Sequence, residues 1–135
     1  MKEGWVGDDY LILFDEAEVV AVTQRYAFSK LFPGYQVLGL RGWDDFIVRD
    51  SQGAISSLPT IPLDPQYLAP YIVPELPRSF SPDPRFTGRI KWYVKPIVFG
   101  GDPAQEENTT WVSLEEHARL VRWWNELYRS TKNKE

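Results

Sequence analysis

The stretch YQVLGLRGWDDFIVRDSQGAISSLP, residues 35–59, decides the fold class of this chain. Its apolar runs at 35–40 and 44–50 predict two strands, and the residues RGW between them interrupt the pattern. SQG follows as a turn, in which Gly53 can adopt the positive φ of a tight hairpin. We therefore expect a hairpin into the next segment, whose prolines place its end at a sheet edge.

Upstream of this stretch the sequence predicts a strand and a helix. YLILF, residues 10–14, is a short apolar run typical of a buried strand. Asp15 and Glu18 then form a capping-box pattern at a helix start. We expect this helix to include Lys30 in its last turn, where a cation suits the helix dipole, and to stop at Pro33-Gly34.

Downstream, residues 90–100 alternate apolar and polar side chains before Pro96, which predicts an interrupted strand. Ser113 and Glu116 form a second capping box at the start of a C-terminal helix. We expect residues 131–135 to be a frayed tail. The helix carries an apolar stripe at helical spacing, formed by Leu114, Ala118, Val121, Trp124 and Tyr128 and widened by Leu120 and Leu127.

The order of these elements predicts the fold class. The 135 residues fit a single domain, residues 1–135, in which the proline-rich segment 70–89 is a long irregular connection. Strand, helix, several strands and helix in succession are typical of an α+β domain. We expect a mainly antiparallel sheet packed by an N-terminal and a C-terminal helix.

Charge and composition narrow the functional classes. The net charge of −4 argues against direct nucleic-acid binding, which requires clustered Lys and Arg. Because the chain has no cysteine, disulfides and thiolate metal sites are excluded. The sequence shows neither a signal-peptide pattern nor a membrane-spanning run of about 20 apolar residues, so we expect a cytoplasmic protein that does not enter membranes.

Two features that resemble catalytic motifs have structural interpretations. Gly100-Gly101 lacks the Lys-Ser/Thr of a phosphate loop, and acidic residues crowd the segment after it, so we expect a structural turn. His117 is the only histidine, and no nucleophile or second nitrogen or sulfur metal ligand accompanies it. We expect it to be partly buried and to bond the preceding loop. No catalytic, cofactor-binding or metal-binding residue is predicted.

Aromatic and acidic residues are the candidates for partner binding, because exposed tryptophan and complementary charge are typical of protein interfaces. Trp43 follows Gly42 in an expected bulge, and we expect it to be exposed. Replacing Trp43 and Asp44 together by Ala should weaken partner binding while leaving thermal stability nearly unchanged. Of Trp123 and Trp124, adjacent on a helix, we expect one in the core. The complete set of candidate partner-binding residues is Trp43, Asp44, Asp45, Asp8, Asp9, Glu106 and Glu107.

Two segments resemble the SMI1/KNR4-like (SUKH) superfamily, and together they cover about half of the chain. In VLGLRGWDDFIVRDSQGAISSLPTIPLDPQYL the matching positions are Gly39, Asp45, Phe46, Asp50, Gly53, Pro59 and Leu63. KPIVFGGDPAQEENTTWVSLEEHARLVRWWN is similar to a segment of bacterial members at Gly100, Gly101, Asp102, Pro103, Asn108, Trp111, His117, Trp124 and Asn125. The front of the chain departs from the family's opening helix, and LFPGY is the nearest match there.

The resemblance implies an α+β domain that binds proteins without cofactors. Many bacterial members are immunity proteins that neutralise toxins, often nucleases, of polymorphic or contact-dependent secretion systems. We therefore predict a non-enzymatic protein, monomeric or homodimeric, whose acidic and aromatic surface occludes a basic toxin. Two alternatives stay open: a small-ligand-binding or enzymatic domain with a pocket near His117, Asp50 and Asp102, and a homodimeric structural or scaffold protein.

Overall fold

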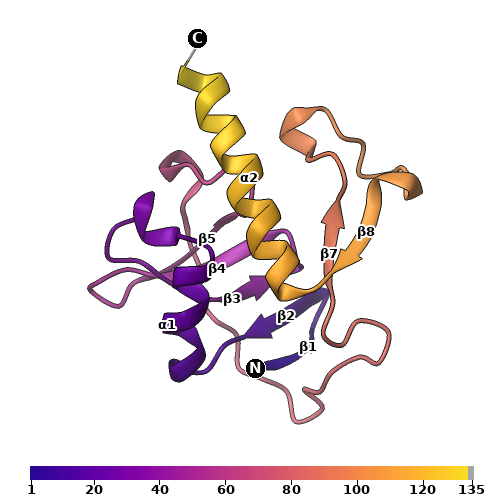
Figure 1. Cartoon of the computed structure of the whole chain (residues 1–135). Coiled ribbons are helices and arrows are strands. Elements are labelled where there is room, and N and C mark those ends of the chain that lie inside the picture. Colours follow the sequence, from indigo (N-terminus) through magenta and orange to yellow (C-terminus); the bar gives the residue numbers. More distant parts are fainter. Residues whose placement is uncertain (134–135) are drawn as a thin grey trace.

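The computed structural model describes residues 1–133 and shows an α+β fold with antiparallel sheets (Figure 1). Within these residues, the larger sheet has its strands in sequence order: β1 (Lys2–Val6), β2 (Asp9–Leu13), β3 (Gln36–Arg41), β4 (Asp45–Arg49), β5 (Ile55–Pro59) and β6 (Ala69–Pro70). A separate antiparallel pair consists of β7 (Ile90–Tyr93) and β8 (Thr109–Val112). The helices are α1 (Glu16–Arg25) and α2 (Leu114–Asn133), and the 3₁₀ turns are η1 (Phe28–Lys30), η2 (Pro65–Tyr67), η3 (Ile97–Phe99) and η4 (Glu106–Asn108). The predicted fold class is confirmed.

The central strands form as the sequence predicts. β3, β4 and β5 pair in antiparallel register, and Gly53 has the positive φ of 88° expected for the turn between β4 and β5. Glycine is also required at Gly39, because a Cβ there would lie 2.2 Å from the carbonyl oxygen of Ile12 on the neighbouring strand. Apolar side chains of these strands are fully buried and form the sheet side of the core: Val37, Leu40, Phe46, Val48 and Leu58.

Helix α1 begins at the predicted cap but ends earlier than predicted. Asp15 and Glu18 form the reciprocal capping box. Two residues after the helix, Ala27 adopts a left-handed φ of 50°, which turns the chain. Lys30 therefore lies in η1, and its prediction in the last turn of α1 is wrong. The early turn is explained by Phe28, which it places fully buried in the core.

The remaining differences lie in short or terminal elements. The sequence patterns do not predict β1 or β8, because neither strand carries a clear alternation of apolar residues. The strand predicted over 90–100 ends at Tyr93, since Pro96 starts the turn η3 instead. Leu127 is 37% exposed and does not belong to the buried stripe. Residues 131–133 continue α2 rather than fray, and residues 134–135 lie outside the described part of the chain.

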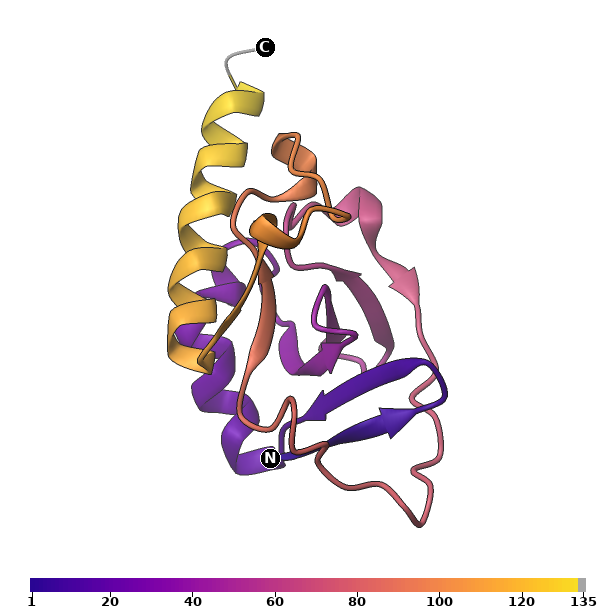
Figure 2. The same ribbon diagram turned by 90° about the vertical axis from the view of Figure 1, so that its right-hand side faces the viewer.

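Helix α2 holds the two sheets together. It packs between α1 on one side and β7 on the other (Figures 1 and 2). On its buried face, His117 is fully buried, and the centroid of its ring lies 5.6 Å from that of Tyr26 and 5.3 Å from that of Trp92. A hydrogen bond of 2.6 Å joins Nδ1 of His117 to the Tyr26 hydroxyl. The side chain is thus completely buried and bonds the end of α1, which corrects the prediction of a partly buried histidine bonding the preceding loop.

The burial of His117 also fixes its protonation state. Desolvation lowers the pKa of His117 to about 3, so the ring is neutral at physiological pH. Its Nε2 has no hydrogen-bond partner, which leaves the Tyr26 hydroxyl as the one polar contact that compensates for its burial. This hydrogen bond should therefore matter to stability.

We expect Tyr26→Phe to lower the free energy of unfolding by about 1–3 kcal/mol, because it leaves a buried imidazole without a partner. Urea denaturation followed by tryptophan fluorescence measures the change. Tyr67→Phe is the matched control, since Tyr67 is 45% exposed, and it should change the free energy by less than about 0.5 kcal/mol. Equal stability of Tyr26→Phe and the wild type would contradict a structural role for the pair.

Candidate functional site

The turn between β3 and β4 has a strained backbone. Gly42 and Trp43 have φ values of 58° and 64°, both in the left-handed region. Glycine adopts this region freely, but a residue with a Cβ does so at a cost of about 1–2 kcal/mol. Strain of this kind persists only where surrounding contacts compensate for it, and it is concentrated at functional sites.

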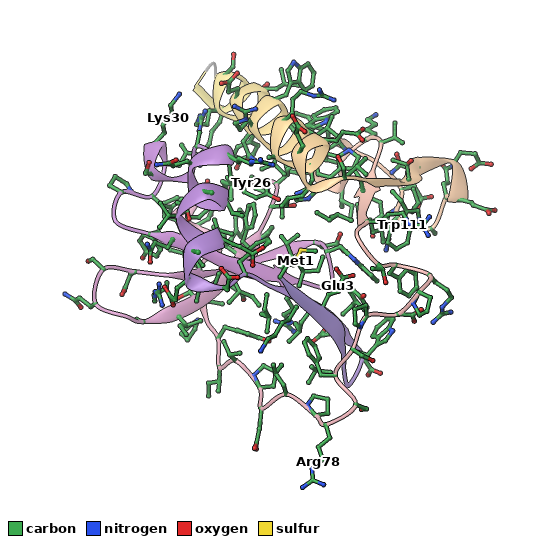
Figure 3. All side chains as sticks on the ribbon, turned by 60° about the horizontal axis from the view of Figure 1, so that its bottom comes forward. Met1, Glu3, Tyr26, Lys30, Arg78 and Trp111 are labelled. Carbon is green, nitrogen blue, oxygen red and sulfur yellow. The ribbon has the colours of Figure 1, made fainter. Side chains whose placement is uncertain are left out.

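An aromatic cluster compensates for the strain at Trp43. Its ring stacks on Tyr10 with centroids 5.1 Å apart. It also meets Phe86 and Trp111 edge to face, each with centroids 5.2 Å apart. Figure 3 labels Trp111, which comes from β8, so the cluster joins the two sheets. Trp43 is half-buried, and the prediction that it is exposed is wrong, because side chains distant in sequence cover it.

Beside this turn, a groove opens between the two sheets. Residues 43–45, 59–61, 91–93 and 96–97 line it; we call it the acidic groove, after Asp44 and Asp45. Its volume is roughly 140 Å³. Pockets for whole metabolites usually exceed about 300 Å³, so this volume suits one inserted side chain. Trp92 lines the groove and contacts the buried His117 behind it.

Two carboxylates dominate the electrostatics of the acidic groove. Desolvation raises the pKa of Asp44, and nearby Lys91 opposes this shift. Desolvation likewise raises the pKa of Asp45, with Arg41 opposing the shift and Asp9 adding to it. A raised pKa means that the ionised carboxylate lacks full stabilisation in the folded protein. A cation brought into the groove would supply that stabilisation.

The rim of the acidic groove beyond β7 is apolar. Val94, Ile97 and Val98 are 53%, 54% and 44% exposed, and Ile97 also lines the groove. Lys91 lies over the ring of Tyr93, 5.0 Å from its centroid, so its ammonium is held at the β7 wall. Exposed apolar residues grouped beside a polar groove are typical of a binding surface.

The wall at residues 59–61 is fixed by an asparagine of α2. The Asn125 side-chain amide donates to the carbonyl of Thr60 at 2.8 Å, and its oxygen accepts from the backbone N–H of Leu63 at 2.7 Å. The buried face of α2 therefore positions one side of the acidic groove.

The other predicted partner-binding residues lie outside the groove lining. Asp9 forms an ion pair with Arg41 at 3.2 Å and does not line the groove. It affects the groove only because its negative charge contributes to the raised pKa of Asp45. Asp8 is exposed in the turn between β1 and β2, and Glu106 and Glu107 are exposed on η4. The structure thus brings together Trp43, Asp44 and Asp45 and leaves the other four acids apart from them.

The residues proposed for an enzymatic pocket have separate structural roles. Asp50 accepts hydrogen bonds from the backbone N–H groups of Gln52 and Ala54 in the hairpin turn. Asp102 accepts from the backbone N–H of Ala104, while His117 is fully buried. These contacts explain each polar side chain locally, and the three side chains do not converge on the acidic groove.

The Gly100-Gly101 pair is a structural turn, as predicted. Gly100 has a φ of 93°, and a Cβ on Gly101 would collide with the Lys95 carbonyl oxygen. Asn108 ties this turn to the end of β7, since its side chain accepts from the backbone N–H of Lys95 and donates to the Lys95 carbonyl. Glycine is therefore needed at 101 for close packing of backbone against backbone.

No metal-binding cluster of three or more His, Asp or Glu side chains occurs among residues 1–133. In the same part of the chain, neither helix combines the length and apolarity needed to cross a membrane.

Comparison of the chain with family models, with curated proteins and with solved structures found no match in any of the three. The resemblance to the SUKH superfamily therefore stays a prediction.

The strain at Trp43 can be tested by comparing two substitutions. Trp43→Ala should lower the free energy of unfolding by about 2–4 kcal/mol, because the aromatic cluster loses its central ring. Trp43→Gly should cost about 1 kcal/mol less than Trp43→Ala, since glycine relieves the left-handed φ. Trp111 lies in an extended strand, where glycine has no advantage. Trp111→Gly should therefore have a lower free energy of unfolding than Trp111→Ala. Urea denaturation measures all four variants, and a Trp43→Gly less stable than Trp43→Ala would contradict the strain.

The raised pKa of Asp45 predicts that its charge destabilises the fold. Between the ordinary pKa of an aspartate and the raised pKa of Asp45, the folded protein still holds the Asp45 proton while the unfolded chain has lost it. The free energy of unfolding therefore falls as the pH rises from the ordinary pKa to the raised pKa. Asp45→Asn should therefore be more stable than the wild type at pH 7, by less than about 1 kcal/mol, and the advantage should shrink towards pH 3. Asp8→Asn, on an exposed turn, is the control and should change little at either pH. A destabilised Asp45→Asn at pH 7 would show that the charge has a compensating partner.

Proposed function

We propose that this chain is a non-enzymatic protein-binding domain whose acidic groove receives a cationic side chain of a basic partner. The observation that carries the proposal is the placement of Asp44 and Asp45 beside Trp43 in one groove, where the half-buried Asp45 has a raised pKa and Asp44 is exposed to an incoming partner. A Lys or Arg inserted there would restore the stabilisation that both carboxylates lack, and Arg would form paired hydrogen bonds with one of them.

The size and surroundings of the acidic groove favour a protein over a small ligand. Perturbed carboxylates in a cleft are also typical of enzyme sites, but roughly 140 Å³ holds a side chain rather than a metabolite. The exposed Val94, Ile97 and Val98 extend the surface beyond the groove, where only a larger partner could cover them. An anchor side chain in a pocket, surrounded by contacts that exclude water, is the usual arrangement of an interface hot spot.

The resemblance to SUKH proteins supplies a more specific form of this proposal. If the chain is an immunity protein, the basic partner is a toxin, often a nuclease in that superfamily, and the domain would neutralise it by covering its active site. Nuclease active sites are basic because they bind phosphates, so an acidic groove with an apolar rim is complementary to them.

The proposal is tested by matched charge reversals in the full chain. The immobilised protein is used to isolate its partner from the native host, and isothermal titration calorimetry then measures affinity for the purified partner. Asp44→Lys/Asp45→Lys should weaken binding at least roughly tenfold, because it replaces attraction in the groove by repulsion. Asp8→Lys/Glu106→Lys changes the net charge equally but lies outside the groove, so it should retain affinity.

Equal affinities for the two double variants would contradict the assignment of the groove. A growth assay addresses the immunity function separately: co-expression of the wild-type chain should protect cells that express the partner, and Asp44→Lys/Asp45→Lys should not. A partner without toxicity would contradict the immunity function but leave the protein-binding proposal intact.

A further inference from the structure

A second groove lies between η1 and α2, and it has the opposite charge. Its volume is roughly 260 Å³. Four cationic side chains line it against the single carboxylate of Glu126: Lys30, Arg119, Arg122 and Arg129. We call it the basic groove, and such a concentration of positive charge is unexpected in a chain whose net charge is −4.

The cations of the basic groove are not neutralised within the protein. None of the four forms an ion pair with another residue in the described part of the chain. Arg122 makes only a long hydrogen bond of 3.4 Å to the carbonyl of Ala118 on its own helix. Acidic neighbours on α2 offset part of this positive charge, because Glu115 lies four residues before Arg119 and Glu126 lies four residues after Arg122. The guanidinium groups still lack close salt bridges among residues 1–133, which leaves them available to a ligand.

An exposed tryptophan lines the basic groove together with these cations. Trp123 is 56% exposed, and it is held edge to face against Trp124 with ring centroids 4.8 Å apart. The half-buried Leu31 adds apolar surface to the groove. Trp123 thus offers a fixed aromatic face bordered by cations, a combination enriched at interface hot spots.

We propose that the basic groove binds an acidic segment of a protein, with carboxylates on the arginines and an apolar side chain on Trp123. Guanidinium groups pair with carboxylates through two parallel hydrogen bonds, so several arginines on one helix face can read a short acidic sequence. This proposal is independent of the acidic groove, since no residue lines both grooves.

A protein segment fits these observations better than a nucleic acid does. A nucleic acid requires a basic track that follows several phosphates, whereas the cations here are confined to one groove on an acidic protein. An acidic peptide carries few charges and supplies apolar side chains for Leu31 and Trp123.

The test uses the full chain and a defined probe. ¹⁵N-labelled protein is titrated with the blocked peptide Glu-Asp-Leu-Glu-Glu-Phe-Asp-Glu-Leu, and NMR shift changes of backbone amides and tryptophan indoles report the site. We expect saturable shifts at α2, η1 and the Trp123 indole, which Trp123→Phe identifies by its loss. Arg119→Gln/Arg122→Gln should weaken the affinity roughly tenfold or more.

Arg78→Gln/Arg89→Gln is the matched control, because it removes the same charge from exposed positions. Arg78 projects from the proline-rich connection at the end of the molecule away from Lys30 (Figure 3). This control and Asp44→Lys/Asp45→Lys should both bind the peptide as the wild type does, which separates this proposal from that for the acidic groove.

Four results would overturn the proposal. One is the absence of saturable shifts up to millimolar peptide, and another is an equal loss of affinity in both arginine double variants. A third is tighter binding of a single-stranded 12-mer of thymidine than of the peptide, which would assign the groove to nucleic acid. The fourth is concentration-dependent dimerisation in sedimentation analysis that Arg119→Gln/Arg122→Gln abolishes, which would assign the groove to a second copy of this chain.

Discussion

The buried face of α2 is the constraint on which the rest of the structure depends. His117 places the ring of Trp92 from one sheet and that of Tyr26 from α1 against the same helix turn. About two turns further along α2, Asn125 satisfies its polar atoms on the segment after β5, at Thr60 and Leu63. Since a buried polar side chain is costly unless it is bonded, these residues fix where α2 lies and how far apart the two sheets stand.

The space that α2 leaves between the sheets is the acidic groove, and features unfavourable for folding are concentrated there. Trp43 holds a left-handed backbone, and two carboxylates have pKa values raised by desolvation. The aromatic cluster around Trp43 compensates for part of this cost, because its rings come from both sheets. Backbone strain and incompletely stabilised charges are expected at sites where a protein binds a partner. These two features therefore support the proposed function of the acidic groove.

The two grooves share their structural support but differ in charge. The end of β5 and the segment after it contribute residues 59–61 to the acidic groove and Leu63 to the basic groove, and Asn125 bonds this segment at Thr60 and Leu63. The molecule therefore presents surfaces of opposite sign, supported by one helix. The net charge of −4 does not reveal that the charges are separated in space. The arginines lie together on α2, whereas Asp44 and Asp45 lie at the start of β4.

The sequence by itself determined the α+β class, the central hairpin, the capping box of α1, the Ser113 cap of α2 and the structural role of Gly100-Gly101, because these depend on local periodicity and turn chemistry. It also indicated Trp43, Asp44 and Asp45 as candidates. Only the tertiary structure decided that Trp43 is half-buried, that His117 bonds Tyr26, and that Lys30 lines one groove with the arginines of α2 and Trp123. The reason is physical: burial, pKa and groove shape arise from contacts between residues distant in sequence, and no local pattern encodes them.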